Sequence, residues 1–130
     1  MGSKPVETMI VLTSGKADRG TRATLAFSWG CAALAMGRNA AVYLTMDGTI
    51  WAAPMATRGV TVAGFEPLQD YIEQFLALGG EILVCAPCSE YYCSLDKARL
   101  GGESLIPGVE LVGLATIVSR IEAQTHVITF

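Results

Sequence analysis

Charged residues are scarce in this sequence, and no basic cluster is present. Asp, Glu, Lys and Arg together make up 16% of the 130 residues, and the nine Lys and Arg residues are scattered along a chain whose formal net charge is −3. A protein that binds a phosphate backbone concentrates basic side chains on one surface. We therefore expect no nucleic-acid partner.

Long apolar runs are also missing. Gly, Arg or Asp interrupts every apolar stretch well before the roughly 20 residues needed to cross a bilayer. The start, Met1-Gly-Ser-Lys-Pro5, lacks the apolar centre of a signal peptide. We expect a cytoplasmic protein without a membrane span, and we expect residues 1–6 to be disordered or derived from an expression vector.

Nucleotide-binding glycine motifs are absent too, because neither G-x-G-x-x-G nor a P-loop pattern occurs. No cofactor is therefore predicted. What the chain has in excess is apolar character: hydrophobic residues make up 52% of it. One domain covering residues 1–130 can bury much of that surface. The remainder favours a homo-oligomer, in which apolar patches meet other subunits.

Short apolar runs alternate with segments of helical spacing, which is typical of βαβ units and a mainly parallel sheet. We predict an α/β fold: a three-layer flavodoxin-like sandwich whose five-stranded sheet carries helices on both faces. The direction of the last strand stays open. The predicted strands are 9–13, 40–45, 81–85, 109–112 and 126–130; the predicted helices are 18–36, 67–78 and 114–123, with one or two short helices between 87 and 100.

A long loop is predicted over residues 50–64, which carry Trp51, Pro54 and Met55 without a sustained period. Loops of this length are often functional. We expect this one to close over a ligand pocket or, more readily in a chain with so little charge, to contact another subunit.

The candidate reactive group is Cys85, which ends a predicted buried strand. Ligands and reactive groups of parallel sheets gather at the carboxyl ends of the strands, where Thr13–Gly15, Met46–Gly48 and Cys85–Cys88 should converge. Pro87 favours a helix start just after Cys85. Backbone N–H groups and the helix dipole would then lower the thiol pKa and supply a nucleophilic thiolate. The alternative is that Cys85 is a small buried apolar residue.

The other cysteines admit several interpretations. Cys88 forms a C-x-x-C pair with Cys85 and either resolves a disulfide or persulfide there or points away. Cys93 and His126 complete a set of four possible zinc ligands. However, Cys88 and Cys93 would lie on different faces of one helix, and His126 opens a separate strand, so no metal site is predicted. Cys31 is interpreted as core packing.

The order of these motifs resembles the DsrE/TusD-like family of small sulfur-relay proteins over most of the chain. The similar segments are Ile10–Ser14, Ala32–Gly37, Val42–Leu44, Asp47-Gly48, Gly80–Cys85, Ala98–Gly101, Leu111–Leu114 and Val127–Phe130. The resemblance implies a persulfide on Cys85, protein sulfur donors and acceptors, and a trimer or hexamer. After that cysteine this chain has Pro87-Cys88-Ser89, where related proteins often have an Arg-Gly pair.

Three functions follow from these observations. The first is a sulfur carrier or sulfurtransferase that uses Cys85 as acceptor, with Cys88 assisting release. The second is a small-ligand-binding or redox-regulatory module without sulfur transfer. The third is a dithiol oxidoreductase that uses Cys85 and Cys88.

Overall fold

The computed structural model describes residues 5–88 and 105–130. Strands and helices alternate along the chain, and the predicted strands are confirmed to within two residues at each end. The strands are β1 (Thr8–Leu12), β2 (Ala40–Leu44), β3 (Glu81–Cys85), β4 (Val109–Val112) and β5 (His126–Thr129). The helices are α1 (Thr21–Ala35), α2 (Leu68–Ala77), α3 (Ala86–Cys88) and α5 (Leu114–Ser119), joined by the 3-10 segments η1 (Lys16–Asp18) and η2 (Met46–Ala52).

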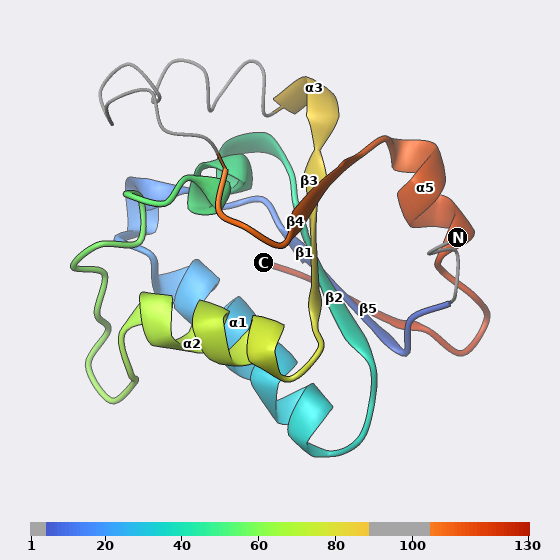
Figure 1. The fold of residues 1–130 in the computed structure, drawn as a ribbon, viewed down its shortest axis with the longest axis horizontal. Helices are drawn as coiled ribbons and strands as arrows, with labels where there is room; N and C mark the ends of the chain where they lie inside the picture. Colours follow the sequence, from blue (N-terminus) through green and yellow to red (C-terminus); the bar gives the residue numbers. More distant parts are fainter. Residues whose placement is uncertain (1–4, 89–104) are drawn as a thin grey trace.

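All five strands run parallel in one sheet with the order β4-β3-β2-β1-β5. The last strand is therefore parallel, with His126 opposite Thr8. The chain steps from β1 to β4 in one direction and then crosses back to the far side of β1. Right-handed crossovers consequently place α1 and α2 on one face and α5 on the other (Figure 1). These are the predicted three layers, although the strand order differs from the 2-1-3-4-5 order of flavodoxin.

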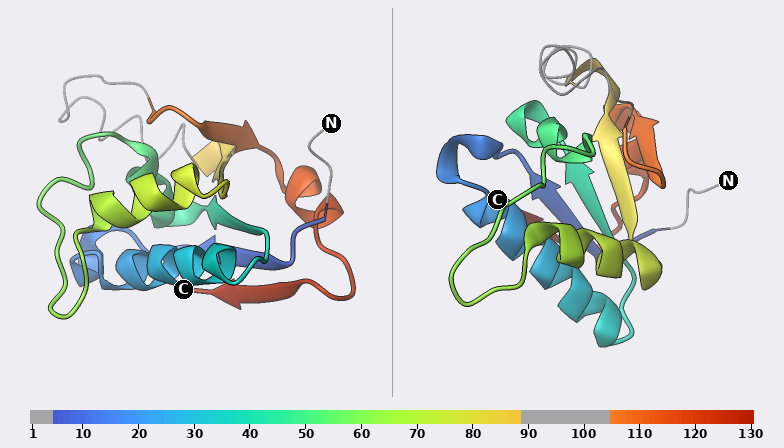
Figure 2. Two further views of the ribbon diagram at one scale, coloured as in Figure 1. Left: turned by 60° about the horizontal axis from the view of Figure 1, so that its bottom comes forward. Right: turned by 60° about the vertical axis from the view of Figure 1, so that its left-hand side comes forward.

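The sheet buries apolar side chains on both faces because successive residues of a strand point to opposite sides. The core beneath α1 and α2 is the larger one and includes Phe27, Trp51 and Phe75. On the α5 face, Met9, Tyr43 and Cys85 belong to a smaller cluster. Figure 2 shows the two long helices lying side by side along their face, whereas the shorter α5 covers one end of the other.

Helix α1 begins at Thr21, three residues after its predicted start, and ends at Ala35, one residue before its predicted end. Asp18 accepts hydrogen bonds from the N–H groups of Gly20 and Arg22, which satisfies donors at the helix start. At its end, Gly37 has a φ of +83°, the left-handed conformation that closes many helices.

Three sequence-based expectations need correction. The helix predicted to reach residue 123 ends at Ser119, where the buried Arg120 instead pairs with Glu81. Val6 is buried and its N–H donates to the Arg120 carbonyl, so the disorder expected of residues 1–6 does not extend to it. Trp51 lies in η2, fully buried, with Nε1 donating to the Ser14 carbonyl at 2.8 Å. Its indole is therefore packed inside the domain, where it lines a cavity together with Lys16, Arg58 and Val60.

The short helices predicted between 87 and 100 lie outside the described residues beyond Cys88, so only their first residues are seen, as α3. In the described part of the chain, no helix combines the length and apolarity needed to cross a membrane.

Candidate functional site

The loops that follow β1, β2 and β3 meet at one edge of the sheet, as predicted. Thr45 donates its N–H to the Leu12 carbonyl. At Gly48 an added Cβ would lie 2.1 Å from that same carbonyl oxygen, so only glycine permits the close approach of the first two loops. The third loop joins them through Cys88, whose Sγ lies 3.6 Å from Thr45 Oγ1. The carboxyl edge is therefore a packed cluster of three loops.

Cys85 is the last residue of β3 and is 7% exposed. Burial alone raises the pKa of a thiol, but here hydrogen-bond donors outweigh it. The largest lowering contributions come from the side chain and the backbone N–H of Cys88, and smaller ones come from the hydroxyls of Tyr43 and Thr45. Together they lower the pKa of Cys85 below its ordinary value. The surroundings of Cys85 thus favour its thiolate form.

Tyr43 adds a polar group that the sequence analysis missed. It lies on β2, the strand next to β3, and shares the apolar cluster of Cys85 on the α5 face. Its hydroxyl is buried and has no hydrogen-bond partner of normal geometry among the described residues, so it influences Cys85 from nearby without a full hydrogen bond. Burial, with a further contribution from Cys85, raises the pKa of Tyr43 to about 12. Tyr43 therefore keeps its proton and remains a donor.

Cys88 lies beside the end of β3 and is more exposed than Cys85. It is half-buried, packs against the cluster that contains Cys85, and lies with its Sγ 3.9 Å from the Sδ of Met46. Met46 has a φ of +53°, in the left-handed region, and its side chain is 50% exposed. The carboxyl edge thus holds the sulfur atoms of Met46 and Cys88 in contact, with Cys85 at the adjoining end of β3.

The remaining sulfur and imidazole groups are elsewhere. Cys31 is buried in α1, and its Sγ donates to the Tyr71 carbonyl at 3.4 Å, in agreement with its predicted role in the core. His126 begins β5 beside Thr8, at the amino end of the sheet, away from Cys85. Cys93 lies outside the described residues. Within the described ranges no three His, Cys, Asp or Glu side chains gather closely enough to hold a metal ion, so the four-ligand zinc set is not assembled there.

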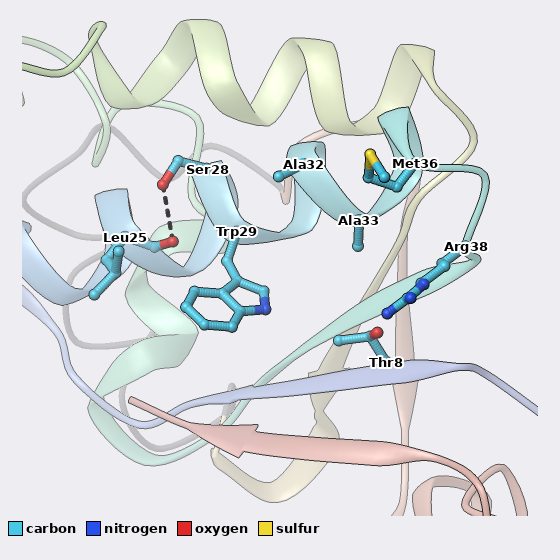
Figure 3. Close-up of a pocket in the computed structure, with 8 residues that line it drawn as sticks. All are labelled: Thr8, Leu25, Ser28, Trp29, Ala32, Ala33, Met36 and Arg38. Carbon is cyan, nitrogen blue, oxygen red and sulfur yellow. Dashed lines mark hydrogen bonds between the residues drawn. The ribbon is translucent and has the colours of Figure 1, made fainter.

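A separate cavity of about 530 Å³ lies beside α1 on the opposite face of the sheet. Figure 3 shows Trp29 projecting from α1 toward the strands, with Arg38 and Thr8 beyond it. The lining residues are Thr8, Leu25, Ser28, Trp29, Ala32, Ala33, Met36 and Arg38. This cavity contains neither Cys85 nor Cys88, and it is therefore distinct from the carboxyl edge.

Two residues of the site, Tyr43 and Thr45, were not singled out by the sequence, whereas Met46 was named as part of a converging loop without a role for its side chain. Tyr43 sits in an apolar run that simply indicates a strand, and Thr45 was predicted as the last residue of that strand. A usable signal did exist: a buried tyrosine needs a partner for its hydroxyl, and this one precedes the strand end by a single residue.

Relatives and structural neighbours agree with this fold. A protein called uncharacterized protein MK0008, from Methanopyrus kandleri, is 29% identical over 110 residues, covering 84% of this chain and 82% of that protein. The crystal structure of the ychN protein from E. coli superimposes with a TM-score of 0.68 at 17% identity, covering 96% of this chain and 99% of that one.

A conserved protein of unknown function from Bacteroides thetaiotaomicron, BT1422, gives a TM-score of 0.58 at 11% identity, with 95% of each chain covered. At these identities the two structures establish the fold alone. The model of the DsrE/DsrF-like family matches residues 7–130, nearly the whole sequence. The chain therefore belongs to the DsrE/DsrF-like family.

Proposed function

We propose that this protein is a cytoplasmic sulfur carrier that accepts sulfur as a persulfide on Cys85 and passes it from a donor protein to an acceptor protein. The observation that carries the proposal is the lowered pKa of a buried thiol at the carboxyl edge of the sheet. A thiolate is the form that attacks sulfur, and the hydrogen-bond donors beside Cys85 favour that form. Membership of the family, which is associated with sulfur relay, supports the same chemistry.

The proposed transfer needs no external oxidant. The Cys85 thiolate attacks the outer sulfur of a donor persulfide, a Cys85–sulfur bond forms, and the donor leaves as a thiolate. An acceptor thiolate then attacks the outer sulfur now on Cys85, and the Cys85 thiolate leaves in turn. The neighbouring donors stabilise the Cys85 thiolate both as attacking group and as leaving group.

Cys88 is proposed to assist release. It follows Cys85 by three residues and packs against the apolar cluster that contains Cys85. Attack of the Cys88 thiolate on the inner sulfur of the Cys85 persulfide would form a Cys85–Cys88 disulfide and expel hydrosulfide. A thiol reductant would then have to restore the pair.

Intact mass spectrometry tests the carrier proposal directly. After incubation with a small-molecule persulfide, the reduced protein should gain about 32 Da, the mass of one sulfur atom added by persulfidation. Cys85→Ser should abolish the gain. Cys31→Ser is the matched control, because Cys31 is equally buried and should carry no sulfur. An unchanged wild-type mass, or an undiminished gain in Cys85→Ser, rejects the proposal.

A dithiol oxidoreductase or redox-regulatory module is the second candidate, favoured by the contact between Cys88 and Cys85. Its signature is a reversible Cys85–Cys88 disulfide whose potential lies in the physiological range, without uptake of sulfur. Titration against thiol buffers of known potential measures this. A simple ligand-binding module would instead retain a co-purifying small molecule after Cys85→Ala.

Assembly into a homo-oligomer, a trimer or hexamer, is part of the proposal. Trp29 is 47% exposed and Met36 77% exposed, and both line the apolar cavity beside α1 (Figure 3). Such contiguous apolar surface commonly marks a protein interface. Light scattering over a dilution series should give a multiple of the 13.7 kDa chain mass. Trp29→Gln should weaken the assembly, whereas Phe65→Gln, which changes an exposed aromatic residue on another loop, should not.

A further inference from the structure

Met46 occupies an unfavourable backbone conformation next to the reactive cysteines. Among the described residues, only Met46 and Arg19 are non-glycines with a positive φ. A side chain with a Cβ is strained in this region, and such strain gathers at functional sites. The side chain of Met46 is also half-exposed, so apolar burial does not account for the strain.

The backbone conformation of Met46 coincides with a sulfur–sulfur contact. Met46 Sδ lies 3.9 Å from Cys88 Sγ, and Cys88 packs against the cluster that includes Cys85. Cys88 follows Cys85 by three residues, in the short helix α3 that begins directly after β3. One thioether and two thiols therefore lie in the segments where β2 and β3 end. The thioether of Met46 is the half-exposed member of this group.

We propose that Met46, Cys85 and Cys88 form a three-sulfur binding site for the soft monovalent ion Cu(I). Thiolate and thioether ligands select Cu(I), which is satisfied by few ligands. Zinc prefers four ligands, and the described residues bring no imidazole or carboxylate into a group of three with these cysteines. Binding displaces the two thiol protons while the thioether stays neutral, so affinity rises with pH and no electron is transferred.

This site is independent of sulfur transfer, although it uses the same cysteines. Copper bound to the Cys85 thiolate would occupy the atom that attacks a persulfide. Prior loading with Cu(I) should therefore block sulfur uptake, if uptake occurs. If the chain binds copper but takes up no sulfur, the metal site is supported and the proposed carrier function is rejected. Failure of the copper site can therefore be told apart from failure of sulfur transfer.

The test is an anaerobic titration of the full chain with Cu(I) held by a chromophoric competing chelator. A Cys93→Ser background confines the readout to Met46, Cys85 and Cys88. We expect one copper per chain and X-ray absorption showing three sulfur neighbours. Met46→Leu keeps the side-chain volume but removes the sulfur, so it should weaken binding about tenfold or more and leave two sulfur neighbours. Met36→Leu, which changes an exposed methionine far from the cysteines, should alter neither result.

Two results would overturn the inference: no copper bound at one equivalent, or equal affinity and sulfur count in wild type and Met46→Leu. A second variant keeps the test clear of folding effects. Met46→Gly relieves the positive φ, so it should raise the melting temperature while lowering Cu(I) affinity. If Met46→Gly is more stable and binds copper as tightly as wild type, the strain serves some other purpose and the three-sulfur site is rejected.

Discussion

Two cysteines in this molecule are buried to nearly the same extent, yet their thiol pKa values are shifted in opposite directions. Cys31 is 6% exposed and Cys85 is 7% exposed. Burial, with a smaller contribution from Glu66, raises the pKa of Cys31 from 9.0 to about 11, whereas the donors around Cys85 lower the pKa of that thiol. Exposure therefore does not separate a structural cysteine from a reactive one in this fold.

Their hydrogen bonds explain the contrast. Inside α1, the Cys31 thiol donates to the Tyr71 carbonyl, and burial raises its pKa because no donor among the described residues offsets the loss of solvent. At the end of β3, Cys85 faces N–H, S–H and O–H donors, which stabilise the thiolate. The end of a parallel strand supplies such donors because the chain leaves the sheet there and enters a helix. Position along an element therefore decides the chemistry more than depth in the core does.

The largest expected difference is in alkylation rate. At pH 7 a thiol of pKa about 11 is at least a hundredfold less ionised than one whose pKa lies below 9.0. The more basic thiolate is more nucleophilic, which offsets roughly tenfold of that difference. Iodoacetamide should therefore modify Cys85 at least about tenfold faster than Cys31. Peptide mass spectrometry measures both rates in one sample, and equal rates would remove the contrast.

Stability should depend on pH with opposite signs at the two sites. The pKa of Cys31 is raised on folding, so its contribution is complete below pH 9 and is lost as pH rises toward 11. The pKa of Cys85 is lowered, so its contribution is present above pH 9 and is lost as pH falls through the folded value. At each site the free energy of unfolding changes by at most about 1.4 kcal/mol per pH unit.

Urea unfolding at several pH values can separate these slopes. Cys31→Ala should lose less stability than wild type between pH 9 and 11, and Cys85→Ala should gain less than wild type as pH rises toward 9. Each substitution also changes the free energy of unfolding by an amount that does not depend on pH, and this amount does not affect the comparison. Parallel curves for all three proteins would show that neither thiol changes its pKa on folding.

A smaller effect should follow from Tyr43→Phe, which removes only the unpartnered hydroxyl near Cys85. Losing this nearby hydroxyl should raise the Cys85 pKa. The measurement is the pH profile of Cys85 alkylation. Thr24→Val is the matched control, because it removes another buried hydroxyl that is unpartnered within the described residues but lies in α1. A profile that shifts equally in both variants would contradict a direct role for Tyr43.

Much of the fold follows from the sequence because strand and helix signals are local. Glu81–Cys85 and Val109–Val112 were predicted with their observed bounds, since glycines or a change of period flank both runs. The end of α5 was misjudged because Arg120 is held by Glu81, a partner far along the chain. Trp51 was misjudged for the same reason, since its indole pairs with the distant Ser14 carbonyl.

The site was predictable only in part. The position of Cys85 at a strand end, beside an incoming helix, follows from order and spacing alone. The contributions of Tyr43 and Met46 depend on the register between β2 and β3 and on one backbone angle, neither of which a single sequence encodes locally. Side chains brought together across a sheet are visible only once the strands are paired.

The pairing of β5 with β1 also constrains how the protein is made. Residues 126–129 lie beside residues 8–11, so β5 must leave the ribosome before this edge of β1 can be covered. Until then an early, strongly apolar strand presents unpaired backbone groups to other nascent chains. Such long-range pairing slows folding. Aggregation during synthesis should therefore depend on how quickly the last strand docks, more than on the stability of the finished fold.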